Sequence, residues 1–96
     1  ADKDNVYALA IARRARAAGD LPRATRAIER AVRMNPFDAG VRELAAATAV
    51  EAGDLAAAER HVEALVAIES DRPVHRARLD RIRALRGADT GSIDGR

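Results

Sequence analysis

Apolar residues recur along this chain at the three- and four-residue spacing that is typical of amphipathic helices. One such stripe precedes Gly19 and a second follows it, and the same arrangement returns on the two sides of Gly53. A last stripe follows Pro73 and contains Leu79, Ile82 and Leu85. The pattern predicts five helices, which we place at residues 5–18, 21–34, 39–52, 55–69 and 73–86. The other positions predicted to face the core are Ala8, Ile11, Ala12, Ala15, Ala18, Ala24, Ile28, Ala31, Val32, Ala45, Ala46, Ala49, Ala52, Ala58, Val62, Leu65 and Val66.

The tripeptide Gly-Asp-Leu marks the corners between these helices. Residues 19–21 recur as residues 53–55, and Gly87 follows, so the glycines stand 34 residues apart twice. A glycine tolerates the left-handed backbone that ends many helices. An aspartate accepts hydrogen bonds from the free N–H groups at the start of the next helix. Each Gly-Asp pair therefore predicts a helix–turn–helix corner, and Asp38 is expected to cap the third helix in the same way.

The repeat resembles the tetratricopeptide repeat family, whose units have the same length. Ala12 and Ala46 stand where that family has a small residue in the first helix of each unit, and Pro36 matches its closing proline. The small–bulky–small signature of its second helix is similar to residues 24–31. The resemblance implies an all-α fold, a right-handed superhelix of antiparallel helical hairpins with about two and a half units. The family's aromatic positions are Ala8, Ala15, Arg42 and Ala49 here, which implies tighter packing through alanine.

The period also divides the chain. We expect an N-terminal extension at residues 1–4, a first unit at 5–38, a second unit at 39–72, a capping helix at 73–87 and a flexible tail at 88–96. A terminal helix of a repeat array needs a polar outer face, and we predict that Arg72, Arg76, Asp80 and Arg83 supply it. The residues after Gly87 are too polar and too rich in glycine to predict a further helix.

Composition excludes several classes of protein. Ninety-six residues form one domain at most, which leaves no room for a large two-layer enzyme. Only Tyr7 and Phe37 are aromatic, which argues against a β-sandwich. There is no cysteine for a disulfide or a thiolate metal site, and no apolar run approaches the roughly 20 residues of a membrane span. We expect a soluble, cytoplasmic chain that is part of a larger protein.

The net charge of +2 conceals three blocks of alternating sign. Residues 1–36 carry eight basic and four acidic groups, residues 37–71 carry two and eight, and residues 72–96 carry seven and three. The acidic centre would repel phosphate, so the chain differs from a uniformly basic nucleic-acid binder. The blocks predict charge pairing between neighbouring segments.

No group of residues in the sequence predicts catalysis, a metal site or a cofactor. His61 lies between Glu59 and Glu63, but residues two apart on a helix point to different faces, so no three-ligand metal face forms locally. We predict that His61 and His75 are solvated surface residues. No hydroxyl has the setting of a nucleophile, and the glycines stand singly rather than in a phosphate-binding loop. We therefore expect that the chain is not an enzyme.

Six arginines between residues 72 and 86 raise the hypothesis of a nucleic-acid contact. No aromatic residue lies among them to stack on bases. The alternative is a solvated capping face in which Asp80 pairs with Arg76 and Arg83 at helical spacing. We favour this second interpretation.

The resemblance also implies a function. In the tetratricopeptide family the first helices of successive units line a concave face, which receives a peptide or a helix of a partner protein. The face would be apolar here with arginine at both ends, which suits a protein segment with apolar and acidic groups. The corresponding positions on this chain are Val6, Leu9, Arg13, Arg16, Glu43, Ala47, Val50, Val74, Ala77 and Arg81.

Other functions stay open. One alternative is an accessory or regulatory domain of a larger enzyme, and the other is the arginine-rich nucleic-acid contact; self-association is compatible with each. One branch of the family binds the C-terminal carboxylates of chaperones through lysine and asparagine on this face. The chain lacks those residues, so we do not predict a chaperone-tail receptor. The residues that it has at the matching positions are Leu9, Arg13, Ala47, Ala77 and Arg81.

Overall fold

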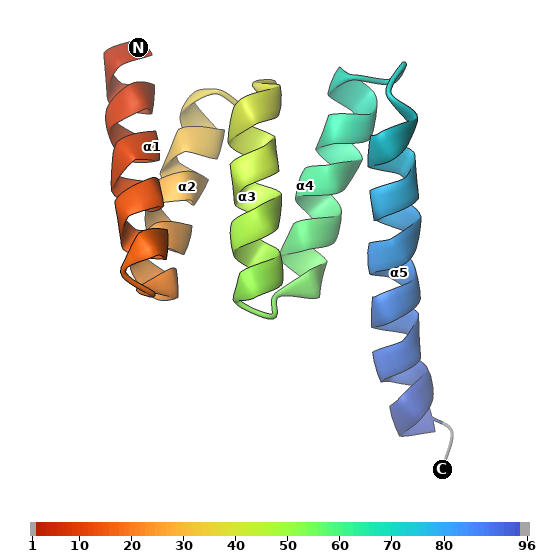
Figure 1. Cartoon of the computed structure of the whole chain (residues 1–96). Helices are drawn as coiled ribbons and strands as arrows, with labels where there is room; N and C mark the ends of the chain where they lie inside the picture. Colours follow the sequence, from red (N-terminus) through yellow and green to blue (C-terminus); the bar gives the residue numbers. More distant parts are fainter. Residues whose placement is uncertain (1, 95–96) are drawn as a thin grey trace.

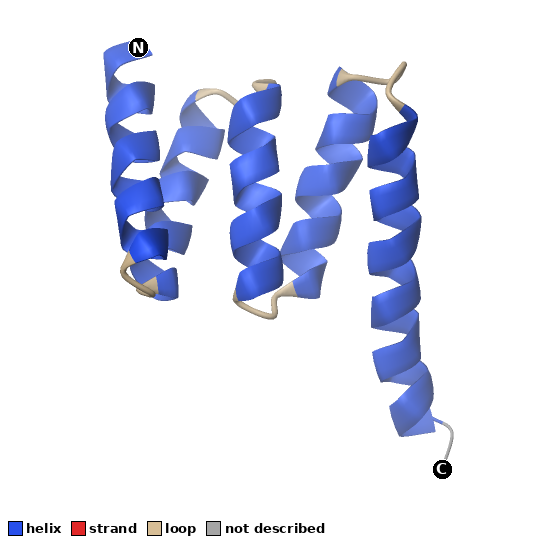
Figure 2. Ribbon diagram, in the orientation of Figure 1, coloured by secondary structure: helices blue, strands red, loops and turns tan. Residues whose placement is uncertain are grey.

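The part of the chain that the structure describes folds into five helices joined by short turns. A computed structural model describes the backbone of residues 2–94 and the side chains of residues 6–88. Over the described backbone there is no β-strand, which confirms the all-helical prediction (Figure 2). The helices are α1 (Asp2–Ala17), α2 (Leu21–Met34), α3 (Ala39–Glu51), α4 (Leu55–Ile68) and α5 (Pro73–Asp94).

The two Gly-Asp-Leu corners have the predicted geometry. Gly19 and Gly53 have φ angles of 79° and 77°, in the left-handed region that favours glycine. After Gly19, the N–H of Asp20 donates to the carbonyl of Ala15 at 2.8 Å, the long hydrogen bond that closes a Schellman helix end. The carboxylate of Asp20 then accepts from the N–H of Arg23 at 3.1 Å and so begins α2. The chain therefore reverses at these corners because one residue ends a helix and the next begins another.

Each helix packs against the next one along the chain, from α1 to α5. Figure 1 shows α1, α3 and α5 in a front layer, with α2 and α4 behind them. The two ends of the described chain lie at opposite ends of this row. The fold is thus a row of helices in two layers, and the odd-numbered helices share one side of it.

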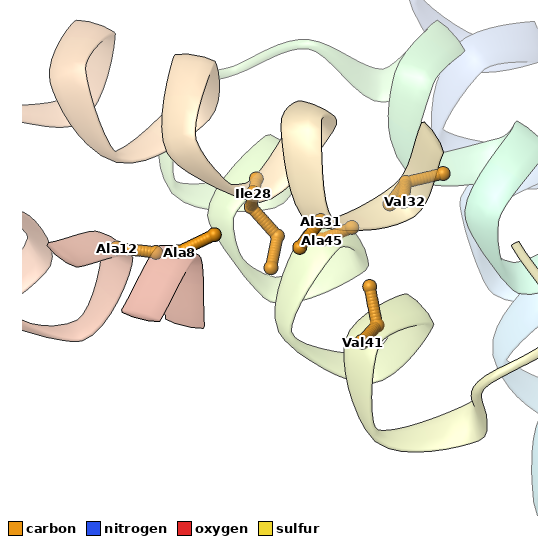
Figure 3. Packing of buried hydrophobic residues seen from close by; sticks show 7 residues of the cluster. All are labelled: Ala8, Ala12, Ile28, Ala31, Val32, Val41 and Ala45. Atoms are coloured by element: carbon orange, nitrogen blue, oxygen red, sulfur yellow. The ribbon is translucent and has the colours of Figure 1, made fainter. Parts of the chain in front are cut away.

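The core consists mainly of alanine and β-branched side chains. In one cluster, Ile28, Ala31 and Val32 of α2 pack between α1 and α3 (Figure 3). A second cluster joins α3, α4 and α5 through residues that include Ala46, Val62 and Leu79. Alanines with no exposed surface at the helix contacts allow the helices to approach closely, as the sequence predicted; these are Ala12, Ala24, Ala31, Ala46 and Ala58.

The predicted core stripes are largely confirmed, with departures near the helix ends. Ile11 and Val66 are half-buried, and Ala18 and Ala52 are exposed because they lie at the corners, after the last residue of each helix. Leu85, which was predicted to pack inward, is 51% exposed. Figure 1 shows that α5 continues beyond the level where α4 begins, so its last turns have no helix beside them.

The prediction that a helix ends at Gly87 is wrong. α5 runs unbroken from Pro73 to Asp94, although its predicted end was residue 86 and a tail was expected from residue 88. Gly87 is not followed by the Asp-Leu pair that caps a new helix at the other two corners, so nothing there competes with helix continuation. A glycine inside a helix costs only about 1 kcal/mol relative to alanine, which a long helix tolerates. The third glycine of the period is therefore not a corner.

Candidate functional site

The predicted binding positions lie on the helices of the front layer, α1, α3 and α5 (Figure 1). Three valines among them have large exposed fractions: 65% for Val6, 49% for Val50 and 48% for Val74. Arg13, Ala77 and Arg81 are also exposed. The remaining positions, Leu9, Arg16, Glu43 and Ala47, are half-buried. All ten are therefore accessible to solvent at least in part, which a binding face requires.

Two ion pairs join the helices of this layer. Arg16 of α1 donates from Nε to Glu51 of α3 at 3.1 Å, with a second bond from Nη2 to the other carboxylate oxygen. Arg78 of α5 donates to the carboxylate of Glu43 of α3. Each pair spans 35 residues, one period plus one position, and so connects neighbouring odd-numbered helices. The charge blocks predicted pairing of this kind, but the sequence placed Arg16 and Glu43 among the partner contacts and did not identify them as members of these pairs.

The ion pair between Arg16 and Glu51 changes the protonation equilibria of both groups. The hydrogen bond from Arg16 lowers the pKa of Glu51 below its ordinary value, and the same bond raises the pKa of Arg16. Both side chains are thus charged at neutral pH and directed at each other. Among the side chains that the structure describes, Arg13 and Arg81 have no such carboxylate partner and are the cations of this face that are open to a ligand.

The prediction that His61 is a solvated residue is wrong, because the residue is only 2% exposed. Its Nδ1 lies 3.0 Å from Nη1 of Arg42, and its Nε2 lies 3.0 Å from Oε2 of Glu29. A guanidinium can only donate, so Nδ1 accepts and the ring proton sits on Nε2, which donates to Glu29. His61 therefore connects α2, α3 and α4, and both of its ring nitrogens have hydrogen-bond partners.

His75 is also buried rather than solvated, with no exposed surface. Its Nε2 donates to Oε1 of Glu69 at 2.6 Å, across the turn between α4 and α5. Its Nδ1 is buried and has no hydrogen-bond partner within the described structure. His75 thus fixes the start of α5 against the end of α4.

The contacts of the two histidines involve few groups of the kinds that bind metals or act as nucleophiles, as far as the described residues show. Within the described residues, no three histidine, cysteine, aspartate or glutamate side chains are grouped closely enough to hold a metal ion. Each histidine contacts a carboxylate, but no hydroxyl is bonded to either ring in the described part of the chain. The buried hydroxyl of Thr48 donates instead to the carbonyl of Leu44 at 2.7 Å.

The arginines between residues 72 and 86 are mostly committed to carboxylates of the acidic block. Arg83 donates to Glu59 at 3.1 Å and to Glu63 at 2.8 Å, and Arg86 also bonds to Glu59. Asp80 was predicted to pair with Arg83, but the carboxylates of α4 take that position because α4 packs directly against α5. These bonds confirm the predicted pairing between charge blocks. They also reduce the number of arginines available to phosphate.

A hollow of about 650 Å³ lies among α2, α3 and α4. It contains none of the predicted binding positions. Its lining residues include Leu21 and Thr25 of α2, Thr48 of α3 and Arg60 of α4. The link from Glu29 to His61 belongs to the same region, since Glu29 also lines the hollow. Small alanine side chains on α3 and α4 leave this space open.

One signal in the sequence could have revealed the buried histidine network. Arg42 occupies a position where the resembling repeat has a large aromatic residue, so a charged side chain there needed an internal partner. Its Nε donates to the carbonyl of Pro36 at 2.8 Å, and its Nη1 donates to His61. Sequence spacing alone could not identify His61, because the contact joins residues 19 positions apart on different helices.

Within the residues that the structure describes, no helix is long and apolar enough to cross a bilayer.

Comparisons with other proteins do not assign the chain to a group. The chain matches no protein-family model, no curated protein and no solved structure.

Proposed function

We propose that this chain is a tetratricopeptide-like module that binds a segment of a partner protein on the exposed faces of α1, α3 and α5, which form the inner side of a right-handed superhelix. The observation that supports this most is the pair of ion bridges, Arg16 to Glu51 and Arg78 to Glu43, between neighbouring odd-numbered helices. The bridges hold three helices side by side, and their exposed positions then form one surface. The partner face is the set of ten positions from Val6 to Arg81 given above.

The chemistry of the partner face defines the kind of segment that it suits. Val6, Val50 and Val74 offer apolar contact on all three helices. Arg13 and Arg81 offer guanidinium groups near the two ends of the row, and each suits fork-like bonding to a carboxylate. The charge of Arg16 is neutralised by Glu51, and that of Glu43 by Arg78, so these two positions contribute little net charge to the face. The face therefore favours a segment with apolar anchors and separated acidic groups.

Selection from a displayed peptide library, followed by affinity measurement on variants, tests this function. Arg13→Ala and Arg81→Ala should each weaken a selected acidic–apolar peptide by about tenfold or more, since a charge-assisted contact contributes roughly 1.5–3 kcal/mol. Arg76→Ala and Arg60→Ala are matched controls, because both are exposed arginines outside the face. They should change the affinity by no more than about threefold.

Two outcomes would reject the proposal. One is a peptide selection in which this chain enriches acidic–apolar sequences no more than a control target does, the control being an unrelated helical protein of similar charge. The other is the reverse ranking, in which Arg76→Ala or Arg60→Ala weakens binding more than Arg13→Ala does. That ranking would place the contact on the outer side of the molecule. The same face would serve equally in an accessory domain of a larger enzyme, since both uses need a protein ligand.

A further inference from the structure

The two helical hairpins, α1 with α2 and α3 with α4, expose equivalent positions to very different extents. Tyr7 of α1 is 70% exposed, whereas its equivalent 34 residues later, Val41, has no exposed surface. Arg14 is exposed, whereas its equivalent Thr48 is buried. The second hairpin is covered on this side and the first hairpin is open.

The covering of the second hairpin shows what fits such a face. Val41 of α3 packs in one cluster with Ile28 and Val32 of α2 (Figure 3). Glu29 of the same helix reaches His61 of α4 at 3.0 Å. The cover is therefore an amphipathic helix with an apolar stripe and a carboxylate beside it. The open side of the first hairpin has the same backbone arrangement and no such cover among the described residues.

The open side is hollowed and basic. Two hollows, of about 390 and 280 Å³, both include Tyr7 and Ile11. The rim of the first contains Arg14 and Arg23, and the rim of the second contains three further arginines; we call this whole surface the N-terminal face. Its one described carboxylate, Asp20, is already bonded to the N–H of Arg23 as a helix cap. The three further arginines are Arg26, Arg30 and Arg33.

The arginines distinguish this face from its covered equivalent. The positions that correspond to Arg14, Arg23 and Arg30 in the second hairpin are Thr48, Ala57 and Ala64, which are all neutral. A helix with the charge of α2, which carries four arginines and one glutamate, would be repelled here. A helix with carboxylates beside its apolar stripe would complement the rim, because guanidinium–carboxylate bonds are strong and directional.

We infer that the N-terminal face binds an acidic amphipathic helix of a partner protein, with apolar side chains against Tyr7 and Ile11 and carboxylates against the surrounding arginines. A second copy of this chain fits less well, because the glutamates at positions 43, 51, 59 and 63 are bonded within the chain. Single-stranded nucleic acid fits less well too, because the floor between the arginines is aliphatic and has one aromatic ring. The site is separate from the partner face, and neither depends on the other.

Binding at the N-terminal face can be followed by the intrinsic fluorescence of Tyr7. Tyr7 is its only tyrosine and there is no tryptophan, so intrinsic fluorescence observes the N-terminal face directly. The probe is a synthetic peptide with the sequence of residues 20–35, in which Arg23, Arg26, Arg30 and Arg33 are replaced by glutamate. It keeps the apolar stripe of the helix that covers the second hairpin. A scrambled peptide of the same composition is the control.

The expected result is a saturable change in Tyr7 fluorescence with the probe and none with the scrambled peptide. In the labelled full chain, amide chemical-shift changes should centre on Tyr7, Ile11 and Ala27. The double variant Arg14→Glu, Arg30→Glu should bind the probe at least about tenfold more weakly. Arg76→Glu, at an exposed arginine of α5 outside both faces, should bind it within about threefold of the parent.

Several results would overturn the inference. They are no saturable binding up to about 1 mM probe, equal binding of the scrambled peptide, and shift changes centred on Leu9, Ala47 and Val50. Tighter binding of single-stranded RNA than of the probe at the same face would assign the arginines to phosphate. Concentration-dependent association of the unliganded chain through Tyr7 would assign the face to a second copy. The shift map uses the unaltered chain, so a variant that folds poorly does not weaken the test.

Discussion

Two junctions hold α4 in place, and they use opposite kinds of polar contact. On the side of α2, one buried imidazole, His61, joins Glu29 and Arg42 with two hydrogen bonds of 3.0 Å. On the side of α5, Glu59 and Glu63 bond to arginines whose side chains are 46% exposed. The first junction depends on one group that is shielded from water, and the second depends on several groups that water and salt reach.

The difference matters because removing a partner has unequal consequences in the two settings. A buried polar group that loses its partner keeps the full cost of its desolvation. An exposed charge that loses its partner is solvated again and contributes little change. The junction between α2 and α4 should therefore be sensitive to a single substitution, whereas the junction between α4 and α5 should be tolerant. Substitutions at the two junctions separate these behaviours.

The largest effect is expected for His61→Ala, which should lower the free energy of unfolding by about 2–4 kcal/mol. The substitution opens a cavity and leaves the Arg42 guanidinium with one internal acceptor fewer. Denaturant unfolding followed by circular dichroism measures the loss. Glu29→Gln is the control, because an amide oxygen still accepts from Nε2 and the loss should be below about 1 kcal/mol. If His61→Ala lowered the free energy of unfolding by less than about 1 kcal/mol, the two hydrogen bonds of His61 would contribute no more to stability than an exposed ion pair does.

The next effect concerns the apolar contacts between neighbouring helices, at Ala12 in the first core cluster and at Ala46 in the second. Ala12→Leu and Ala46→Leu should each destabilise the fold by about 1–3 kcal/mol, because both alanines have no exposed surface and the added atoms need new space. Ala67→Leu is the matched control on an exposed position of α4. Thermal unfolding at one pH compares the three variants. Stabilities of Ala12→Leu and Ala46→Leu equal to the parent would mean that these alanines do not limit the approach of the helices.

The smallest effect is expected at the exposed junction, where it should depend on pH and salt. Arg86 and then Arg83 lower the pKa of Glu59, and Arg16 lowers that of Glu51, below the ordinary value of 4.5. A carboxyl group with a lowered pKa in the folded state stabilises the fold above its ordinary pKa. This contribution is lost as the pH falls through the folded-state pKa. The free energy of unfolding should therefore decrease below about pH 4.5.

The double variant Arg83→Ala, Arg86→Ala should reduce this decrease in the free energy of unfolding at acid pH, which we call the acid limb. At pH 7 it should change the stability less than His61→Ala does. In 1 M salt, where charges are screened beyond about 3 Å, the parent should approach the double variant. Equilibrium unfolding at a series of pH values and two salt concentrations tests both statements. An acid limb that is unchanged in the double variant would mean that Glu59 is not linked to these arginines in solution.

Much of the fold could be predicted because local chemistry determines it. The corners at Gly19 and Gly53 follow from a residue that accepts positive φ and an aspartate that caps the next helix. The end of α5 was predicted wrongly because Gly87 stands at the repeat spacing but is not followed by an aspartate that could cap another helix. A glycine alone does not end a helix.

The candidate site could be predicted only in outline. The helical period identified positions that are accessible, but Arg16 and Glu43 turned out to be bonded within the chain. The burial of His61 and His75 was missed because it depends on which helix lies opposite each ring. Contacts between residues far apart in sequence depend on how helices are arranged in space, and spacing along one helix does not contain that information.

The sequential packing of the helices has a consequence for how the protein folds. Each helix packs mainly on its neighbours in the chain, so most contacts close only short loops. Proteins dominated by such local contacts fold within microseconds to milliseconds. A row of this kind also opens from its ends, since α1 and α5 are each packed on one side only. Amide hydrogen exchange should therefore be slowest in α2, α3 and α4, and the partner face and the N-terminal face both include helices from the faster-opening ends.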